Sequence, residues 1–128
     1  NIINTRIKVL LAQSIIKKAE ENQLRITNLP TGEAGYELLK NPEEITILEK
    51  TLYRFPEVVS HSYTELEPHH IATYLTELAS AFNSFYANTV IIDKDNPCAP
   101  YRVLLVEAFH QTMKNGLWLL GIETPEKM

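Results

Sequence analysis

Two adjacent histidines, His69 and His70, carry imidazole nitrogens that can ligate a metal ion. Glu65 and Glu67 precede them in the sequence and offer carboxylate oxygens. Neighbouring residues on a helix point about 100° apart, however, and a helical zinc pair needs histidines four residues apart. No cluster of cysteine and histidine elsewhere in the sequence adds further ligands. The spacing therefore predicts no metal site.

The one cysteine, Cys98, stands without a sequence context that would make it a nucleophile, so a small, partly buried thiol is expected. It cannot form a disulfide within the chain, which favours a reducing cytoplasm. His61 and His110 are isolated and are expected at or near the surface. The four glycines form no nucleophile elbow, phosphate-binding loop or dinucleotide motif. No catalytic residue and no bound cofactor are predicted for this chain.

One residue in a series of aromatic side chains could bind an RNA base instead of supporting catalysis. Tyr74, Phe82 and Phe85 fall at helical spacing, which is typical of a buried stripe. Tyr86 is rotated by about 100° from Phe85, toward the edge of that stripe and the end of the helix. A half-exposed tyrosine there could stack on an unpaired base, a contact worth roughly 1–3 kcal/mol. Spacing alone leaves Tyr86 open to both interpretations, a core residue or a stacking surface.

The length and composition of the chain indicate what kind of domain can carry these residues. The 128 residues suffice for one domain, 1–128, with a sizeable core, and 45% of them are hydrophobic. No window approaches about 18 uncharged apolar residues, so no membrane span is predicted, and no secretory signal is recognised. The chain begins with Asn1 and enters a helical pattern by Ile7, so a fragment of a longer protein is expected.

The net charge of −4 argues against a general nucleic-acid binder, and DNA binding is not expected. The charge is unevenly distributed. Residues 1–30 hold five basic and two acidic groups, whereas residues 31–70 hold three basic and eight acidic ones. Any RNA contact is therefore expected to be local, through stacking and base edges more than through a broad phosphate-binding face.

The first half of the chain contains three helical patterns. The first helix is expected from Ile7 to about Asn22, and a connection follows over Leu24–Gly35. A helix start is predicted at Asn41-Pro42-Glu43-Glu44, where Asn can cap and Pro suits the first position. Pro56 is expected to end or kink that helix, and Val58-Val59 to begin another short one.

The second half contains two longer patterns. The clearest helix is expected from Pro68 to about Tyr86, followed by a loop over Asn88–Pro97. The last long helix is predicted from Pro100 to Lys114, and Asn115-Gly116 is interpreted as its stop signal. With four or five helices and no convincing strand pair, the sequence predicts an all-α bundle of about five helices.

Two segments carry a family resemblance. Pro68 to Tyr86 reads P-H-H-I-A-T-Y-L-T-E-L-A-S-A-F-N-S-F-Y and resembles the arginyl-tRNA synthetase pattern P-x-x-[LI]-x-x-Y-L-x-x-L-A-x-x-F-x-x-F-Y. Asn115 to Met128 reads N-G-L-W-L-L-G-I-E-T-P-E-K-M and resembles that family's terminus, N-G-L-x-L-L-G-[IV]-x-x-P-x-x-M. The resemblance covers roughly residues 13–128. The domain type is named for an Asp-Ala-Leu-Arg run, of which Ala99-Pro100-Tyr101-Arg102 keeps only the Arg.

This resemblance implies the C-terminal anticodon-binding domain of an arginyl-tRNA synthetase. The domain would bind the anticodon stem and loop of arginine tRNA, beside the enzyme's own catalytic domain, which is absent here. The parent enzyme joins arginine to tRNA with ATP and magnesium, and this fragment would need no cofactor of its own. The resemblance implies RNA contacts by Tyr86 through stacking, by the Met128 carboxylate, and by Arg102 and Lys127. For Arg102, a buried structural salt bridge is an equal alternative to a phosphate contact.

Two other interpretations remain. The related tail domain of bacterial glycyl-tRNA synthetase has the same kind of fold, although the L-L-G-I-x-x-P-x-x-M terminus disfavours it. A helical protein–protein interaction module belongs to a different functional class. The weak basic balance of the chain is the observation that favours it.

Overall fold

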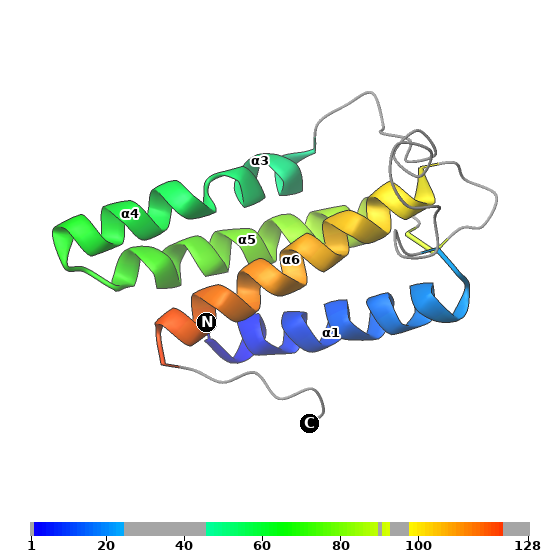
Figure 1. Cartoon of the computed structure of the whole chain (residues 1–128), viewed down its shortest axis with the longest axis horizontal. Helices are drawn as coiled ribbons and strands as arrows, with labels where there is room; N and C mark the ends of the chain where they lie inside the picture. Colours follow the sequence, from blue (N-terminus) through cyan, green and yellow to red (C-terminus); the bar gives the residue numbers. More distant parts are fainter. Residues whose placement is uncertain (1, 25–45, 90, 93–97, 122–128) are drawn as a thin grey trace, which may run out of the picture.

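The computed structural model describes residues 2–24, 46–89, 91–92 and 98–121, with side chains from residue 5 onward. These residues form five α-helices and contain no strand, which confirms the predicted all-α class (Figure 1). The helices are α1 (Ile2–Glu21), α3 (Ile47–Tyr53), α4 (Phe55–Glu65), α5 (His69–Asn88) and α6 (Ala99–Leu119).

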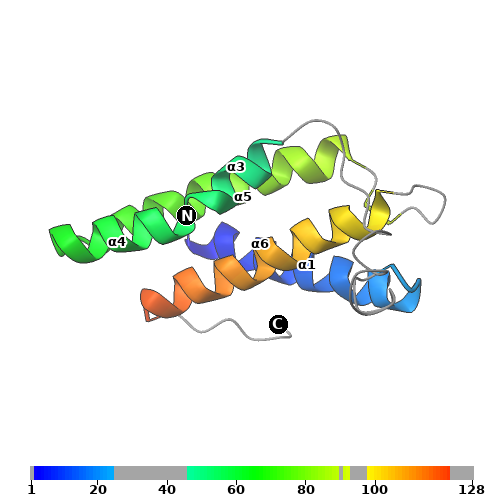
Figure 2. The same ribbon diagram turned by 45° about the horizontal axis from the view of Figure 1, so that its top comes forward.

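The helices pack as a bundle in which α1 and α5 run in one direction and α3, α4 and α6 in the other (Figures 1 and 2). Helices α3 and α4 follow one another along α5, and α6 packs on α5 from another side. Helix α1 runs antiparallel to α6 and also contacts α5. One end of the bundle therefore gathers the last turns of α1 and α5 with the first turn of α6. The α4–α5 turn and the last turn of α6 lie at the opposite end.

Helix α1 begins earlier than predicted, at Ile2 instead of Ile7. Residues 2–6 contain neither Pro nor Gly, so nothing in the sequence interrupts the backbone hydrogen bonds before Ile7. The buried face of this helix reaches back to Thr5, which is 2% exposed. Helix α1 ends where Gln23 adopts a left-handed backbone with φ of 57°. The Leu24 N–H then donates to the Ala19 carbonyl at 2.9 Å and closes the last turn.

Helix α3 begins at a capping box that the sequence analysis missed. Thr46 has an extended backbone, its hydroxyl accepts from the Glu49 N–H, and the Glu49 carboxylate accepts from the Thr46 N–H. The helix that carries Leu48 therefore begins at Ile47, and the predicted start at Asn41–Glu44 lies outside the described residues.

The break between α3 and α4 confirms the effect predicted for Pro56. Helix α3 ends at Tyr53 and α4 begins at Phe55, with Pro56 in its first turn, where no intrahelical donor is needed. Helix α4 therefore starts at Phe55, three residues before the predicted start at Val58. A tyrosine hydroxyl holds the junction, since Tyr74 Oη donates to the Thr51 carbonyl at 2.5 Å.

The apolar stripe of α5 is buried as predicted and forms the centre of the core. Its buried members are Ile71, Tyr74, Leu75, Leu78, Ala79, Ala81, Phe82 and Phe85. Helix α5 begins at His69 after Pro68 and continues to Asn88, two residues beyond the predicted end.

The predicted stop of α6 at Asn115-Gly116 is wrong, because the helix continues to Leu119. Gly116 is buried, and a Cβ built on it would lie 2.6 Å from Leu75 Cδ2. The glycine therefore serves the close approach of α6 to α5 and not a helix end. The left-handed residue is Gly121, with φ of 80°, and its N–H donates to the Trp118 carbonyl at 2.9 Å.

Candidate functional site

The side chain of Tyr86 lies at the edge of the core with part of its ring exposed. Its ring is nearly parallel to that of Phe82, with centroids 6.3 Å apart and planes 26° apart. Phe82 in turn stacks on Phe109 of α6 at 4.1 Å with planes 5° apart. Phe82 and Phe109 are fully buried, whereas Tyr86 is 48% exposed. Three stacked rings thus lead from the interior to the surface.

Helix α6 brings Arg102 to the end of the bundle where Tyr86 lies. Tyr86 belongs to the last turn of α5, and Arg102 to the first turns of α6, so both lie at the same end of the bundle (Figure 1). Arg102 is partly buried and already engaged in an interaction within the chain. Its main-chain N–H donates to the Cys98 carbonyl at 3.0 Å in the first helical turn. The structure therefore brings two of the four predicted RNA-contact residues to one end, while Lys127 and Met128 lie outside the described residues.

Exposed cations at this end come mainly from α1. Lys17 and Lys18 are exposed in the last turns of α1, which ends at the same end of the bundle as the first turn of α6 (Figure 1). Glu20 and Glu21 lie within the same turn and are also exposed. The positive potential of this end is consequently modest, in agreement with the net charge of −4.

Two other tyrosines are structural. Burial raises the pKa of Tyr74 to about 12, and its hydroxyl remains a donor to the Thr51 carbonyl. Burial also raises the pKa of Tyr101 to about 12, helped by a 2.7 Å hydrogen bond to Glu49 Oε2. These hydroxyls join α3 to α5 and to α6. They fix the frame in which the half-exposed Tyr86 is held.

A polar cluster at the opposite end brings together the two histidine side chains that the spacing argument expected to diverge. The Nε2 atoms of His69 and His70 lie 3.5 and 3.0 Å from the same carboxylate oxygen, Glu67 Oε2. Side chains in a first helical turn lean toward the N-terminus, so adjacent residues there can both reach back to a residue before the helix. The two side chains therefore converge on Glu67 although their Cα–Cβ bonds diverge.

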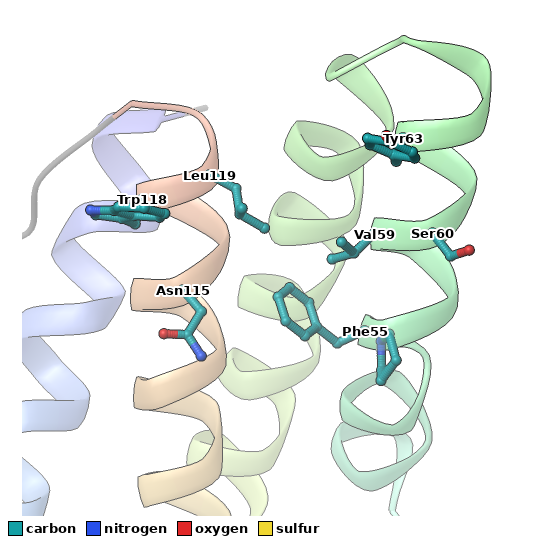
Figure 3. Close-up of a pocket in the computed structure, with 8 residues that line it drawn as sticks. Phe55, Val59, Ser60, Tyr63, Asn115, Trp118 and Leu119 are labelled. Atoms are coloured by element: carbon teal, nitrogen blue, oxygen red, sulfur yellow. The ribbon is translucent and has the colours of Figure 1, made fainter.

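An apolar groove of about 750 Å³ separates α4 from the last turns of α6 (Figure 3). Trp118 and Tyr63 stand at its rim and are 73% and 81% exposed. Its remaining lining residues are Phe55, Pro56, Val59, Ser60, Asn115 and Leu119. The sequence analysis did not identify the exposure of Trp118, because that exposure depends on the continuation of α6 to Leu119.

Among the residues that the structure describes, no helix has the length and apolar character needed to cross a membrane. A family model described as the DALR anticodon binding domain matches residues 8–128. The chain is also similar to proteins named arginine–tRNA ligase. One from Geobacter metallireducens is 40% identical over 115 residues, which is 90% of this chain and 20% of the relative.

Two further relatives carry the same name. The protein of Pyrococcus furiosus is 40% identical over 119 residues, covering 90% of this chain and 18% of the relative. That of Geotalea daltonii is 47% identical over 90 residues, covering 70% and 16%. The chain thus spans about a fifth of the length of the curated relatives it matches.

Proposed function

Because this chain belongs to the DALR anticodon-binding domain family, we propose that it binds the anticodon stem and loop of an arginine tRNA. The observation that carries the proposal is the family match over residues 8–128, joined to relatives named arginine–tRNA ligase. The alternative of a glycyl-tRNA synthetase tail domain has no comparable support. The whole enzyme would charge the tRNA with arginine, and this domain would identify the tRNA by its anticodon.

Tyr86 is the proposed stacking residue. One face of its ring lies toward Phe82, which is rigidly packed on Phe109, and the remaining exposed surface is available to a base. A ring held this way loses little conformational entropy when a base stacks on it. Bases splayed out of an RNA loop are commonly bound by such aromatic side chains, at roughly 1–3 kcal/mol each.

The C-terminal residues are proposed to read the central anticodon base. Arginine anticodons share a central cytosine, whose exocyclic amine is a hydrogen-bond donor. A main-chain carbonyl at or near Met128 would accept from that amine. A uracil would present a carbonyl oxygen to the same acceptor and leave it unsatisfied, which is costly in a desolvated contact.

Cationic side chains would contact phosphates beside the stacked base. Arg102 lies at the Tyr86 end of the bundle, and Lys127 is proposed from the sequence resemblance. With a net charge of −4, nonspecific attraction to RNA is weak, so base contacts must supply most of the preference. The same reasoning favours an unpaired RNA loop over duplex DNA.

The other partner proposed is the catalytic domain of the same enzyme. We assign ATP and magnesium to that catalytic domain, and this chain contains no glycine-rich phosphate-binding loop. The charging of tRNA and the single cysteine together support a cytoplasmic location.

A substitution pair tests the role of Tyr86. Tyr86→Ala should weaken binding of an arginine-tRNA anticodon stem-loop by roughly 1–3 kcal/mol, measured by fluorescence anisotropy at low salt. Tyr63→Ala is the matched control, because Tyr63 is also exposed but lies at the opposite end of the bundle. Equal affinities for the two variants and the unsubstituted chain would remove Tyr86 from the RNA contact.

A further inference from the structure

We propose that Glu67, His69 and His70 form a binding site for a zinc-class divalent metal ion at the α4–α5 turn. This site is independent of the anticodon function, because it lies at the far end of α5 from Tyr86. His69 and Tyr86 are seventeen residue steps apart on the helix, which corresponds to roughly 25 Å along the axis.

The distances between the ligand atoms fit such an ion. Glu67 Oε2 lies 3.5 Å from His69 Nε2 and 3.0 Å from His70 Nε2. All three ligand atoms lie within 4.8 Å of one another. Zinc bonds to imidazole nitrogen and carboxylate oxygen are about 2.0–2.2 Å long, so the edges of a zinc tetrahedron measure roughly 3.3–3.5 Å. Small rotations of the side chains would complete the geometry.

The ligand types select the class of metal. Two imidazole nitrogens and one carboxylate oxygen suit zinc and neighbouring transition metals, whereas calcium and magnesium require oxygen ligands. The side chains of His69, Glu67 and His70 are 66%, 50% and 30% exposed. A metal ion can therefore enter from solvent, and water would take the fourth position.

The surrounding structure holds the ligands in place. The Ser62 hydroxyl donates to the Glu67 carbonyl at 2.6 Å, and the Glu67 N–H donates to the Ser62 carbonyl at 3.1 Å. Ser62 is only 5% exposed, so these bonds fix the backbone of Glu67 against α4. Preorganised backbone of this kind reduces the entropy lost when a ligand side chain is immobilised.

The histidine rings are also supported by their neighbours. The ring of His61, from α4, lies 4.6 Å from that of His70, which in turn lies 4.3 Å from that of His69. His61 is thus a positioning residue that packs beside His70. A bound ion would link the turn before α5 to the first turn of α5 and stabilise the folded chain.

Isothermal titration of the metal-free 128-residue chain with zinc chloride tests the proposal. We expect one zinc ion per chain with a micromolar Kd, and no displacement by millimolar calcium or magnesium. Glu67→Gln, His69→Gln and His70→Gln should each weaken binding at least tenfold. The controls are Glu57→Gln, an exposed carboxylate on α4, and His110→Gln on α6, which should bind as the unsubstituted chain does. Circular dichroism verifies that each variant remains helical.

A second measurement does not depend on the variants. Cobalt(II), which substitutes for zinc, absorbs strongly in the visible region when four-coordinate and weakly when six-coordinate. A strong visible spectrum that zinc abolishes is expected. Absence of zinc binding, zinc binding unchanged in all three ligand variants, or a weak six-coordinate cobalt spectrum would each overturn the proposal.

Discussion

The ring of Tyr86 stacks one helical turn after that of Phe82, with their centroids 6.3 Å apart. The two residues share a helix face but differ in environment, since Phe82 is fully buried and Tyr86 is 48% exposed. The inner ring is held by Phe109 of α6. The core of the bundle therefore extends outward to the ring that we propose to meet an RNA base.

This difference in burial predicts different costs of truncation. Phe82→Ala should lower the free energy of unfolding by about 3–5 kcal/mol, because it leaves a cavity between α5 and α6. Tyr86→Ala should cost about 1 kcal/mol or less, because half of its ring is already in water. Urea denaturation followed by circular dichroism measures both. An equal loss in the two variants would make Tyr86 a core residue and weaken its proposed role in binding.

The close helix contact at Gly116 predicts that replacing this glycine by alanine lowers the stability of the chain. Replacement of a helix-interior glycine by alanine usually stabilises a protein by about 1 kcal/mol. Here the added Cβ would lie 2.6 Å from Leu75 Cδ2, in a fully buried contact between α6 and α5. Gly116→Ala should therefore destabilise the chain by about 1 kcal/mol, measured by urea denaturation.

A double substitution provides the control for Gly116. Leu75→Val shortens the side chain that the new methyl group would meet, so it should offset part of the cost of Gly116→Ala. Purely additive effects, or a Gly116→Ala chain more stable than the unsubstituted one, would contradict the close helix contact.

The raised pKa of Tyr74 predicts that the folded chain loses stability at high pH. Burial raises its pKa in the folded chain from its usual value of 10.0 to about 12. Above about pH 10 the unfolded chain loses this proton while the folded chain keeps it, so stability should fall between about pH 10 and 12. The loss attributable to Tyr74 is roughly 2–3 kcal/mol. Tyr74→Phe should make this part of the profile less steep and leave the share due to Tyr101, whose pKa is also raised to about 12. An unchanged slope would show that Tyr74 does not contribute.

The cations at the Tyr86 end predict a weak salt dependence of RNA binding. Lys17, Lys18 and Arg102 belong to that end, and together they would neutralise about three phosphates. The logarithm of the binding constant should then fall with the logarithm of the salt concentration with a slope of about −2 to −3. Anisotropy titrations across a salt series measure it. A slope steeper than about −5 would indicate a broad phosphate-binding face instead.

The sequence predicted the parts of the fold that depend on local patterns. The stripe of Tyr74, Phe82 and Phe85 fell on the buried face of α5, and Pro56 separated α3 from α4 as expected. These features follow from periodicity and from the missing proline N–H, which are both visible in a short stretch of sequence.

The features that sequence reasoning missed depend on contacts between elements. Asn115-Gly116 has the composition of a helix stop, and only the position of Leu75 on α5 explains why the helix continues. The convergence of His69 and His70 on Glu67 depends on where α5 begins, one residue after Pro68. For the proposed RNA site, spacing indicated the edge position of Tyr86, whereas the stack through Phe82 to Phe109 required the packing of α6.

The central claim is tested most directly by binding the chain to two RNA stem-loops at low salt. One carries an arginine anticodon, and the other differs only in a central uridine in place of cytosine. We expect at least tenfold tighter binding of the cytosine-containing loop, because its amine donates where a uracil oxygen would repel. Equal affinity for both loops, or binding to neither, would contradict an anticodon-reading role for this chain.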